Sequence, residues 1–354
     1  MYNLDDIKTI EKFDKSNMRR LLSEFPQQEG KIVQSMKHVK LPSAYKEVKN
    51  ILVSGLGGSS VGGDLLKNFS RDRLKLPLIV NRGYTLPHWI SKESLLICVS
   101  YSGNTEETLS TYRIGKKRGS KLVVISSGGE LTELAKKDGF PCILVPEGGI
   151  PPRTALGYLF FPQLLVLKML GLINIEDEEL SEVARTLEGL REEIDIHSPQ
   201  NENIAKKIAG EIYQTVPLVY TTSDYLEGVG IRWKTQINEN SKSPVYYGFF
   251  PELDHNEIMG WEGTKELVGK FSLILLRDKD ESARMKKRID ITLSLIKEKT
   301  GKISEVYSRG GGLLSRIMSL TYIGDYVSFY LGILNGVDPT DIKSILSLKK
   351  RMSE

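Results

Sequence analysis

Short apolar runs alternate with longer, helix-like segments along most of this chain. In the first half the runs span residues 50–53, 76–80, 95–99, 121–126 and 142–145, and in the second half 216–220, 245–249, 271–276 and 303–307. Apolar runs of this kind, separated by helical segments, are typical of buried strands in a parallel sheet that helices cover on both faces. The sequence therefore predicts an α/β protein with two doubly wound parallel sheets.

A charged segment divides the chain into two blocks. Residues 1–45 are polar and helical in pattern, and we expect them to pack on the outside of the first domain. Residues 46–175 would form that domain, residues 176–205 a linking helix, and residues 206–354 a second domain with C-terminal helices. With 354 residues, 40% of them hydrophobic, the chain is long enough for two separate cores.

Composition narrows the class of protein. The net charge is +4, from 49 basic and 45 acidic residues that are interspersed, so it argues against a nucleic-acid partner and is compatible with an anionic small substrate. We find no targeting peptide and no uninterrupted apolar span, which predicts a cytoplasmic protein without a membrane segment. The four His and two Cys residues lack metal-ligand spacing. Cys98 and Cys142 lie in apolar runs, as reduced core residues do.

Residues 100–108, SYSGNTEET, follow the third apolar run directly and open a predicted helix. A helix N-terminus offers unpaired N–H groups and a partial positive charge to an anion. Ser100, Ser102 and Thr105 add hydroxyl donors, and Gly103 lets the backbone close on a ligand. Because the turn has no Lys, the pattern predicts a cradle for a monophosphate and not for a triphosphate. An ordinary N-cap followed by an acidic first turn would use the same residues.

A second turn, containing Gly57, Gly58 and Ser59, follows the first strand-like run. Ligands of doubly wound sheets sit at the carboxyl ends of strands, so both turns can face one crevice. The dinucleotide fingerprint fails because its last glycine is replaced by Ser60, and no acidic ribose partner follows the second strand. An NADP site stays open through Arg82. The glycines also suit a tight strand–helix turn without a ligand.

Three isolated side chains complete a candidate site. Arg153 follows two prolines that fix the backbone, and it can stabilise a developing oxyanion or simply lie on the surface. Considered one at a time, Glu239 and His255 are interpreted as solvated residues without a function. Taken with a phosphate cradle, an Arg, a Glu base and a His acid/base suit proton abstraction next to a carbonyl.

These pieces together resemble the bifunctional phosphoglucose/phosphomannose isomerases of the sugar isomerase (SIS) domain superfamily. The matching segments are GLGGSS at 55–60, SYSGNTEET at 100–108, PPR at 151–153, NEN around Glu239, DHNE at 254–257 and DYVSFYL at 325–331. The resemblance implies two SIS domains, each with a five-stranded parallel sheet, in a homodimer. It also implies a cofactor-free sugar-phosphate isomerase that acts on glucose 6-phosphate, fructose 6-phosphate and mannose 6-phosphate through ring opening and a cis-enediol.

The resemblance also implies roles for individual residues. Gly57, Gly58 and Ser59 would line the sugar-phosphate site, and Ser100, Ser102 and Thr105 would hold the phosphate. Arg153 would stabilise the enediolate, Glu239 would move a proton between C1 and C2, and His255 would assist ring opening from the partner subunit. Lys349, or its neighbour Lys350, would contact substrate, and Thr321 or Thr340 would allow either configuration at C2.

Other functions remain open from the residues alone. The two halves look like a loose duplication, and because only the first carries the full Ser/Gly signature, only that half is predicted to bind phosphate. A phosphosugar-binding sensor without catalysis would use the same cradle, although no helix-turn-helix segment flanks it. An isomerase of another phosphosugar is a further alternative. An amino-sugar enzyme with a glutaminase domain is disfavoured, because Met1-Tyr2-Asn3 offers no N-terminal Cys.

Overall fold

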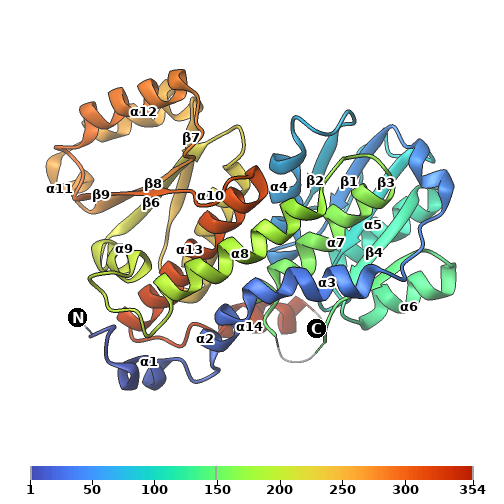
Figure 1. The fold of residues 1–354 in the computed structure, drawn as a ribbon, viewed down its shortest axis with the longest axis horizontal. Helices are drawn as coiled ribbons and strands as arrows, with labels where there is room; N and C mark the ends of the chain where they lie inside the picture. Colours follow the sequence, from blue (N-terminus) through green and yellow to red (C-terminus); the bar gives the residue numbers. More distant parts are fainter. Residues whose placement is uncertain (1, 148–149, 353–354) are drawn as a thin grey trace.

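The computed structural model describes residues 2–147 and 150–352 and has two α/β lobes side by side (Figure 1). In the first lobe five parallel strands are ordered β2-β1-β3-β4-β5. They are β1 (Asn50–Ser54), β2 (Leu78–Asn81), β3 (Ser94–Val99), β4 (Lys121–Ser126) and β5 (Cys142–Leu144). This confirms each strand predicted for the first half, within two residues of its ends.

The second lobe has a parallel sheet ordered β7-β6-β8-β9. Its strands are β6 (Val216–Thr222), β7 (Tyr246–Phe250), β8 (Phe271–Arg277) and β9 (Lys302–Tyr307). The expectation of five strands here is wrong, because the described residues give this sheet four. The apolar sequence that follows β9 enters α13 (Leu313–Leu334) instead, a 22-residue helix buried along its length.

Helices cover both faces of each sheet. The facing inner helices are α4 (Gly58–Ser70) and α7 (Leu156–Met169) in the first lobe, and α10 (Glu227–Ser241) and α13 in the second. The outer helices are α5 (Glu106–Lys117) and α6 (Gly129–Asp138) on the first lobe, and α12 (Ala283–Ile296) on the second. Helix α4 packs against α10 across the boundary between the lobes.

The two lobes share their largest core. Side chains of a strand alternate between faces, so Val53 and Ile97 point inward while Leu52 and Leu96 point to the outer core under α5 and α6. The inward residues of both sheets join one continuous cluster with α4, α7, α10 and α13. Each outer face has a smaller core of its own. The lobes are therefore not two independently packed units.

The N-terminal helices, the predicted linking helix and the helix after it pack against the two lobes. They are α1 (Ile7–Phe13), α2 (Met18–Ser23), α3 (Gln28–Met36), α8 (Asp177–Ile194) and α9 (Ile204–Ile212). Helix α3 packs against α7 of the first lobe, as expected for residues 1–45, whereas α1 and α2 contact α13 of the second. Helix α8 begins with a capping box formed by Glu176 and Glu179 and buries an apolar stripe against α13. The proposed domain boundaries remain predictions.

Two further helices complete the described chain, α11 (Lys265–Val268) and α14 (Lys343–Met352), with short 3₁₀ turns η1 (Phe25–Gln27), η2 (Ser43–Glu47), η3 (Pro152–Thr154), η4 (Glu252–His255) and η5 (Glu257–Glu262). Helix α13 is long and apolar enough to cross a membrane, but its apolar window is completely buried inside the protein. Burial of this kind is what the core helix of a globular protein shows. Helix α14, in contrast, buries none of its residues.

Candidate active site

The candidate site lies where the strand order of the first sheet reverses. Strand β1 has β2 on one side and β3 on the other, so the loops after β1 and β3 leave the sheet toward opposite faces. In doubly wound sheets ligands bind in the crevice at this point. The turn with Gly57 to Ser59 follows β1, and the turn with Ser100 to Thr105 follows β3. Both turns predicted from the sequence therefore meet at the expected edge.

The turn after β3 is held in a fixed shape. The hydroxyls of Ser100 and Thr105 are 2.8 Å apart, and the Gly103 N–H donates to Ser100 Oγ at 3.1 Å. Thr105 is the N-cap of α5 but makes no capping bond with its side chain, so N–H groups of the first helical turn remain for an anion. Ser102 is exposed at the mouth of the turn. The geometry is that of an anion cradle.

Close contact with a neighbouring turn explains why a glycine is needed in the cradle. Gly103 has φ +69°, and a Cβ placed on it would lie 1.8 Å from the carbonyl O of Gly128. Gly129, in turn, lies so close that its Cβ would be 2.4 Å from Ser102 O. The loops after β3 and β4 thus contact each other through the backbone of their glycines, and a side chain at Gly103 or Gly129 would prevent this contact.

Backbone contacts join the two turns to Arg153. Ser59 Oγ accepts a hydrogen bond from Tyr101 N at 3.4 Å, which links the first turn to the cradle. On its other side the first turn meets η3, since a Cβ on Gly58 would lie 3.0 Å from Pro152 O. Arg153 follows Pro152 directly. The sequence-predicted residues of the first lobe therefore form one continuous surface.

Arg153 connects that surface to the second lobe. Its guanidinium is 3% exposed and donates from Nη1 to Glu239 Oε1 at 2.9 Å, from Nε to Asn240 Oδ1 at 2.7 Å, and from Nη2 to Pro339 O at 2.8 Å. Glu239 and Asn240 lie at the C-terminal end of α10. The Glu239 side chain keeps 29% of its surface exposed, so a ligand can reach its carboxylate. Structure and sequence agree in bringing Arg153 and Glu239 together.

Burial and charge determine the electrostatics of this pair. Burial lowers the pKa of the Arg153 guanidinium, and the nearby Glu239 carboxylate opposes that effect. An Arg remains charged at any physiological pH, so the site holds a fixed cation next to a carboxylate. A cation held in this way can stabilise negative charge that develops on a substrate oxygen.

Sequence reasoning missed three neighbours of the pair. Asn240 and the carbonyl of Pro339 orient Arg153, and Lys242 donates to Glu239 O at 2.9 Å and to Asp338 O at 2.8 Å. Burial, followed by repulsion from Arg153, lowers the pKa of Lys242 to about 8. Asn240 and Lys242 could have been suspected from their adjacency to Glu239. The role of the Pro339 carbonyl has no signal in the sequence.

His255 and Lys349 contact none of these residues. His255 is exposed at the end of η4, the turn that follows β7, and Lys349 is exposed on α14. Neither side chain has a hydrogen bond or ion pair within the part of the chain that the structure describes. The structure thus brings together all predicted site residues of the first lobe and Glu239, but not these two.

In the second lobe, hydrogen bonds and ion pairs hold the segments after β8 and β9. Glu182 from α8 accepts hydrogen bonds from Gly311 N, Gly312 N and Ser315 Oγ at the start of α13. At the end of β8, Arg277 pairs with Glu281 and with Glu305. A carboxylate of the protein therefore occupies the N-terminus of α13, the helix that follows β9. Phosphate binding by only one half of the chain stays a prediction.

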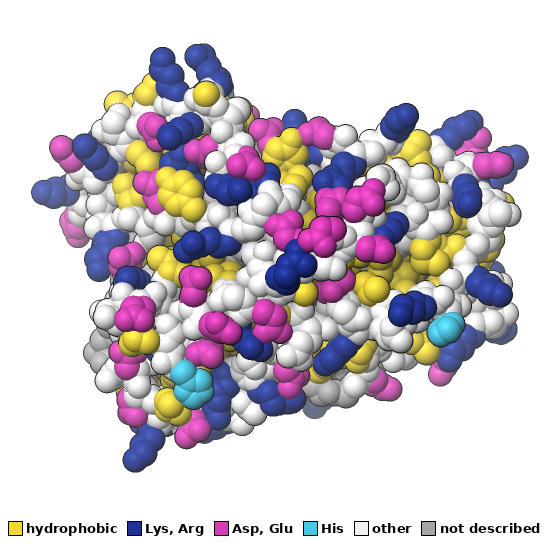
Figure 2. Space-filling view, in the orientation of Figure 1, with side chains coloured by type: hydrophobic (Ala, Val, Ile, Leu, Met, Phe, Trp, Pro, Cys, Tyr) yellow, Lys and Arg dark blue, Asp and Glu magenta, His cyan; other side chains and the backbone are white. Residues whose placement is uncertain are grey.

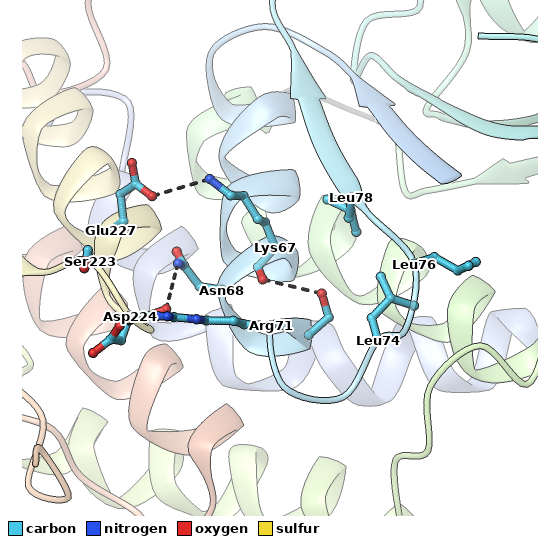
Figure 3. A pocket seen from close by; sticks show the side chains of 10 residues that line it. Lys67, Asn68, Arg71, Leu74, Leu76, Leu78, Ser223, Asp224 and Glu227 are labelled. Carbon is cyan, nitrogen blue, oxygen red and sulfur yellow. Dashed lines mark hydrogen bonds and ion pairs between the residues drawn. The ribbon is translucent and has the colours of Figure 1, made fainter. Parts of the chain in front are cut away.

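A pocket of about 360 Å³ opens between the lobes at the far end of α4 (Figure 3). Its charged groups are paired with one another: Lys67 Nζ is 3.5 Å from Glu227 Oε2, and Arg71 pairs with Asp224. Arg82, the remaining candidate for an NADP phosphate, pairs with Asp64. The first two ion pairs join the lobes, whereas Arg82 and Asp64 both belong to the first lobe. The described cations of the pocket, Lys67 and Arg71, are thus each paired with a carboxylate.

The visible charges of the surface agree with the sequence. On the face shown in Figure 2, Lys and Arg side chains are mixed with Asp and Glu, in agreement with the interspersed charges of the sequence. Within residues 2–147 and 150–352, no three His, Cys, Asp or Glu side chains gather as a metal site requires. Cys98 and Cys142 are both free.

Comparison with known proteins finds similar sequences among sugar-phosphate isomerases. Residues 201–352 match the family model described as the bacterial phospho-glucose isomerase C-terminal SIS domain. The chain is 42% identical over 329 residues to a bifunctional phosphoglucose/phosphomannose isomerase from Caldicellulosiruptor bescii, covering 93% of this chain and 97% of that protein. It is 36% identical over 307 residues to one from Aquifex aeolicus, covering 86% and 91%.

Among solved structures, the fold resembles a glucose-6-phosphate isomerase like protein from Thermus thermophilus. The TM-score is 0.63, at 19% sequence identity, over 97% of this chain and 99% of that one. At this level of identity the likeness shows a shared fold and nothing more.

Proposed function

This chain belongs to the bifunctional phosphoglucose/phosphomannose isomerase family, and we propose on that premise that it interconverts fructose 6-phosphate with both glucose 6-phosphate and mannose 6-phosphate. The observation that carries the proposal is the Arg153–Glu239 pair, 2.9 Å apart, beside a hydroxyl-lined turn at the switch point of the sheet. A base, a fixed cation and an anion cradle are what proton transfer between adjacent carbons of a sugar phosphate requires.

In the proposed reaction the phosphate binds to Ser100, Ser102 and Thr105 at the start of α5. Binding energy from the phosphate, remote from the reacting carbons, orients the open-chain sugar over Glu239. Glu239 removes the proton from C2 of the aldose and returns it to C1, while a proton passes from the C2 hydroxyl to the C1 oxygen, which gives the ketose. Arg153 stabilises the negative charge on the enediolate oxygen between the two transfers. One base suffices because it reaches both C1 and C2 from the same face of the planar intermediate.

We propose Thr340, and not Thr321, as the residue that allows either configuration at C2. Thr321 is fully buried in α13, and its hydroxyl donates to Ile317 O at 2.8 Å. Thr340 follows Pro339, the carbonyl partner of Arg153, and its Oγ1 is buried without a hydrogen-bond partner in the described part of the chain. An unpaired buried hydroxyl next to the site favours a bond to a substrate hydroxyl.

Lys349 is proposed as a substrate contact, with Lys350 as the alternative. Because α14 buries none of its residues, the helix can move toward the site without losing packing. This proposal depends on such a movement, since Lys349 is exposed and contacts none of the other site residues.

We also propose a homodimer in which His255 reaches the site of the partner subunit and there moves the proton needed for ring opening. An apolar surface next to η4 supports this. A pocket of about 290 Å³ has Ile258, Ile291 and Leu295 in its lining together with charged and polar side chains, and Ile291 and Leu295 are more than half exposed. Asp254, next to His255, is 2.9 Å from Arg288 Nη1, which fixes η4 to α12. Exposed apolar patches of this kind mark interfaces.

The first test is Glu239→Gln, which removes the base and keeps the size of the side chain. We expect turnover of fructose 6-phosphate to fall below detection while calorimetry still shows binding, because the cradle is untouched. Glu178→Gln, on the exposed face of α8, is the matched control and should behave as wild type. Near-normal turnover in Glu239→Gln would exclude Glu239 as the base.

The shared site is tested by mixing two inactive variants, Glu239→Gln and His255→Ala. In a mixed dimer one site combines an intact Glu239 with an intact His255 from the other subunit. After random exchange, roughly one quarter of wild-type activity should return, because half of the dimers are mixed and each has one complete site. No recovery, despite exchange shown by a tag on one variant, would mean that His255 acts within its own subunit or not at all.

Two alternatives use the same cradle. A phosphosugar-binding protein without catalysis would bind fructose 6-phosphate and leave it unchanged. An isomerase of another phosphosugar would leave it unchanged but convert a different ketose phosphate. The Arg153–Glu239 pair favours an enzyme over a binding protein, since phosphate binding alone needs neither residue.

A further inference from the structure

We propose that Ser328, on α13, is a positioning residue for Arg153, and that it acts by fixing the orientation of the Asn240 carboxamide. Asp325 is the buried anchor of the same network. This inference rests on the proposed function, in which Arg153 stabilises the enediolate. It concerns residues that do not touch the substrate but set the direction in which the guanidinium points.

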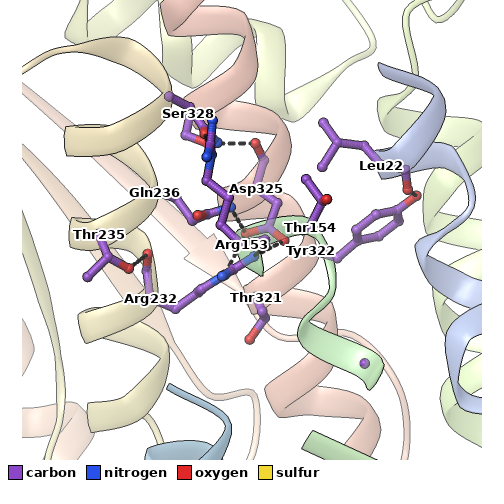
Figure 4. Close-up of polar contacts among 12 residues, drawn as sticks. Leu22, Arg153, Thr154, Arg232, Thr235, Gln236, Thr321, Tyr322, Asp325 and Ser328 are labelled. Carbon is purple, nitrogen blue, oxygen red and sulfur yellow. Dashed lines mark hydrogen bonds and ion pairs between the residues drawn. The ribbon is translucent and has the colours of Figure 1, made fainter. Parts of the chain in front are cut away.

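The network begins with a polar stripe on α10. Arg232, Gln236 and Asn240 lie four residues apart, so they share one face of the helix. Each is at most 1% exposed, and the face lies against α13 and not against solvent. Burying a charge and two amides costs free energy unless every polar atom finds a partner. The partners present are Asp325 and Ser328 of α13, and Arg153 (Figure 4).

One chain of bonds fixes the backbone of Arg153. Asp325 accepts from Arg232 Nε at 2.9 Å and from Arg232 Nη2 at 2.9 Å, and it also accepts from Gln236 Nε2 at 3.0 Å. The same Nη2 of Arg232 donates to the carbonyl of Arg153. A fork-shaped ion pair of this kind has a fixed geometry, so it holds η3 in place against α10.

A second chain fixes the side chain of Arg153. Ser328 Oγ donates its single proton to Asp325 O at 2.7 Å, so it can only accept from Asn240 Nδ2, 2.9 Å away. The Nδ2 end of the amide therefore faces Ser328, and the Oδ1 end faces Arg153 Nε at 2.7 Å. Ser328 and Arg153 thus specify the same orientation of the amide, because Ser328 Oγ can only accept and Arg153 Nε can only donate.

Loss of the Ser328 hydroxyl would leave the buried Asn240 Nδ2 without the acceptor it has in this structure. The amide would then tilt toward another acceptor, because burying an unpaired amide N–H costs free energy. Its Oδ1 would move with it, and the guanidinium that donates to this oxygen would turn away from Glu239. Because catalysis requires reacting groups to be placed within a fraction of an ångström, such a change lowers kcat more than it changes binding.

The test compares two buried serines at the same helix interface. Ser328→Ala should lower kcat for fructose 6-phosphate roughly tenfold, with KM within about twofold of wild type. Ser241→Ala is the matched control, since Ser241 is fully buried and its Oγ donates to Ser328 O at 2.7 Å, but it does not bond to Arg153 or its amide partner. Both variants should lose similar thermal stability, and only Ser328→Ala should lose kcat.

An unchanged kcat in Ser328→Ala, or an equal loss in Ser241→Ala, would overturn the positioning role. Arg153→Lys separates this result from failure of the proposed function. If Arg153→Lys abolishes turnover and Ser328→Ala does not lower it, the function stands and the positioning inference fails. If Arg153→Lys keeps normal turnover, the proposed role of Arg153 itself is wrong.

Discussion

Replacing Gly103 by Ala tests whether the cradle is as rigid as the structure requires. Gly103 has φ +69°, and an added Cβ would lie 1.8 Å from Gly128 O, whereas real Cβ atoms stay beyond 3.0 Å. The atoms in the way are backbone atoms of Gly128 and Gly129, so no side chain can rotate away to make room. The turn after β3 and the turn after β4 must therefore part by roughly 1 Å.

The expected cost follows from the bonds that join these turns. Leu131 N donates to Gly103 O at 2.9 Å, and Glu130 N donates to Asn104 Oδ1 at 3.0 Å. A displacement of this size weakens both, at about 1 kcal/mol each, and the left-handed backbone costs Ala about 1 kcal/mol more. We expect Gly103→Ala to lose about 3 kcal/mol of unfolding free energy. Because Ser100 and Thr105 lie in the displaced turn, KM should rise about tenfold or more.

Gly139→Ala is the matched control for this prediction. Gly139 also has a positive φ, +74°, but nothing lies within 4 Å of its added Cβ. It should lose only about 1 kcal/mol, with KM unchanged. Urea denaturation and initial rates with fructose 6-phosphate measure both quantities. Equal stability losses and equal KM values in the two variants would refute the braced cradle.

Two further predictions concern buried groups outside the site. Burial raises the pKa of Glu29, which is 7% exposed. Its side chain has no ion pair or hydrogen bond within residues 2–147 and 150–352. Its contribution to the free energy of unfolding is therefore present at acidic pH and is lost as the pH rises through the folded-state pKa. Glu29→Gln should therefore be more stable than wild type at pH 7 in urea denaturation, with the difference vanishing toward pH 4; a pH-independent difference would contradict this. A Cβ on Gly324 would lie 2.4 Å from Trp233 Nε1, which donates to Leu320 O at 2.9 Å, so Gly324→Ala should lose about 2–3 kcal/mol by separating α13 from α10. Thermal denaturation followed by tryptophan fluorescence measures that loss, and an unchanged midpoint would show that the two helices are not tightly packed here.

The strands could be predicted from the sequence because each is a local apolar run. Strand β4 occupies residues 121–126, as predicted, and β3 differs from its prediction by one residue. The number of strands in the second sheet could not be obtained in this way. Family likeness suggested five, but the apolar sequence after β9 folds as α13, whose burial comes from both lobes at once.

The site was predictable where the sequence carries local chemistry. The cradle at Ser100 and the Gly57 turn are strand–turn–helix signals, so their position at the switch point followed from topology. Arg153 and Glu239 are candidates from the sequence and take their roles from the resemblance, but their contact spans 86 residues of sequence, which no local pattern encodes. The contact of Arg153 with Pro339 spans 186 residues and was missed altogether.

The packing of the two lobes against each other could not be predicted from the sequence, because it also depends on contacts between distant residues. The common core of α4, α7, α10 and α13 forms only when both sheets are present, so predicted separate cores gave way to a shared one. The stripe of Arg232, Gln236 and Asn240 looks like a solvated helix face in the sequence. Its burial depends on Asp325 and Ser328, almost a hundred residues away.

The central claim is that the Arg153–Glu239 site isomerises a phosphosugar at C2 in either configuration. The most direct measurement supplies fructose 6-phosphate to the purified protein in EDTA and follows glucose 6-phosphate and mannose 6-phosphate separately with coupled enzymes. We predict that both products form and that both are lost in Glu239→Gln. Formation of neither product would contradict the account, and formation of glucose 6-phosphate alone would contradict the proposed tolerance at C2.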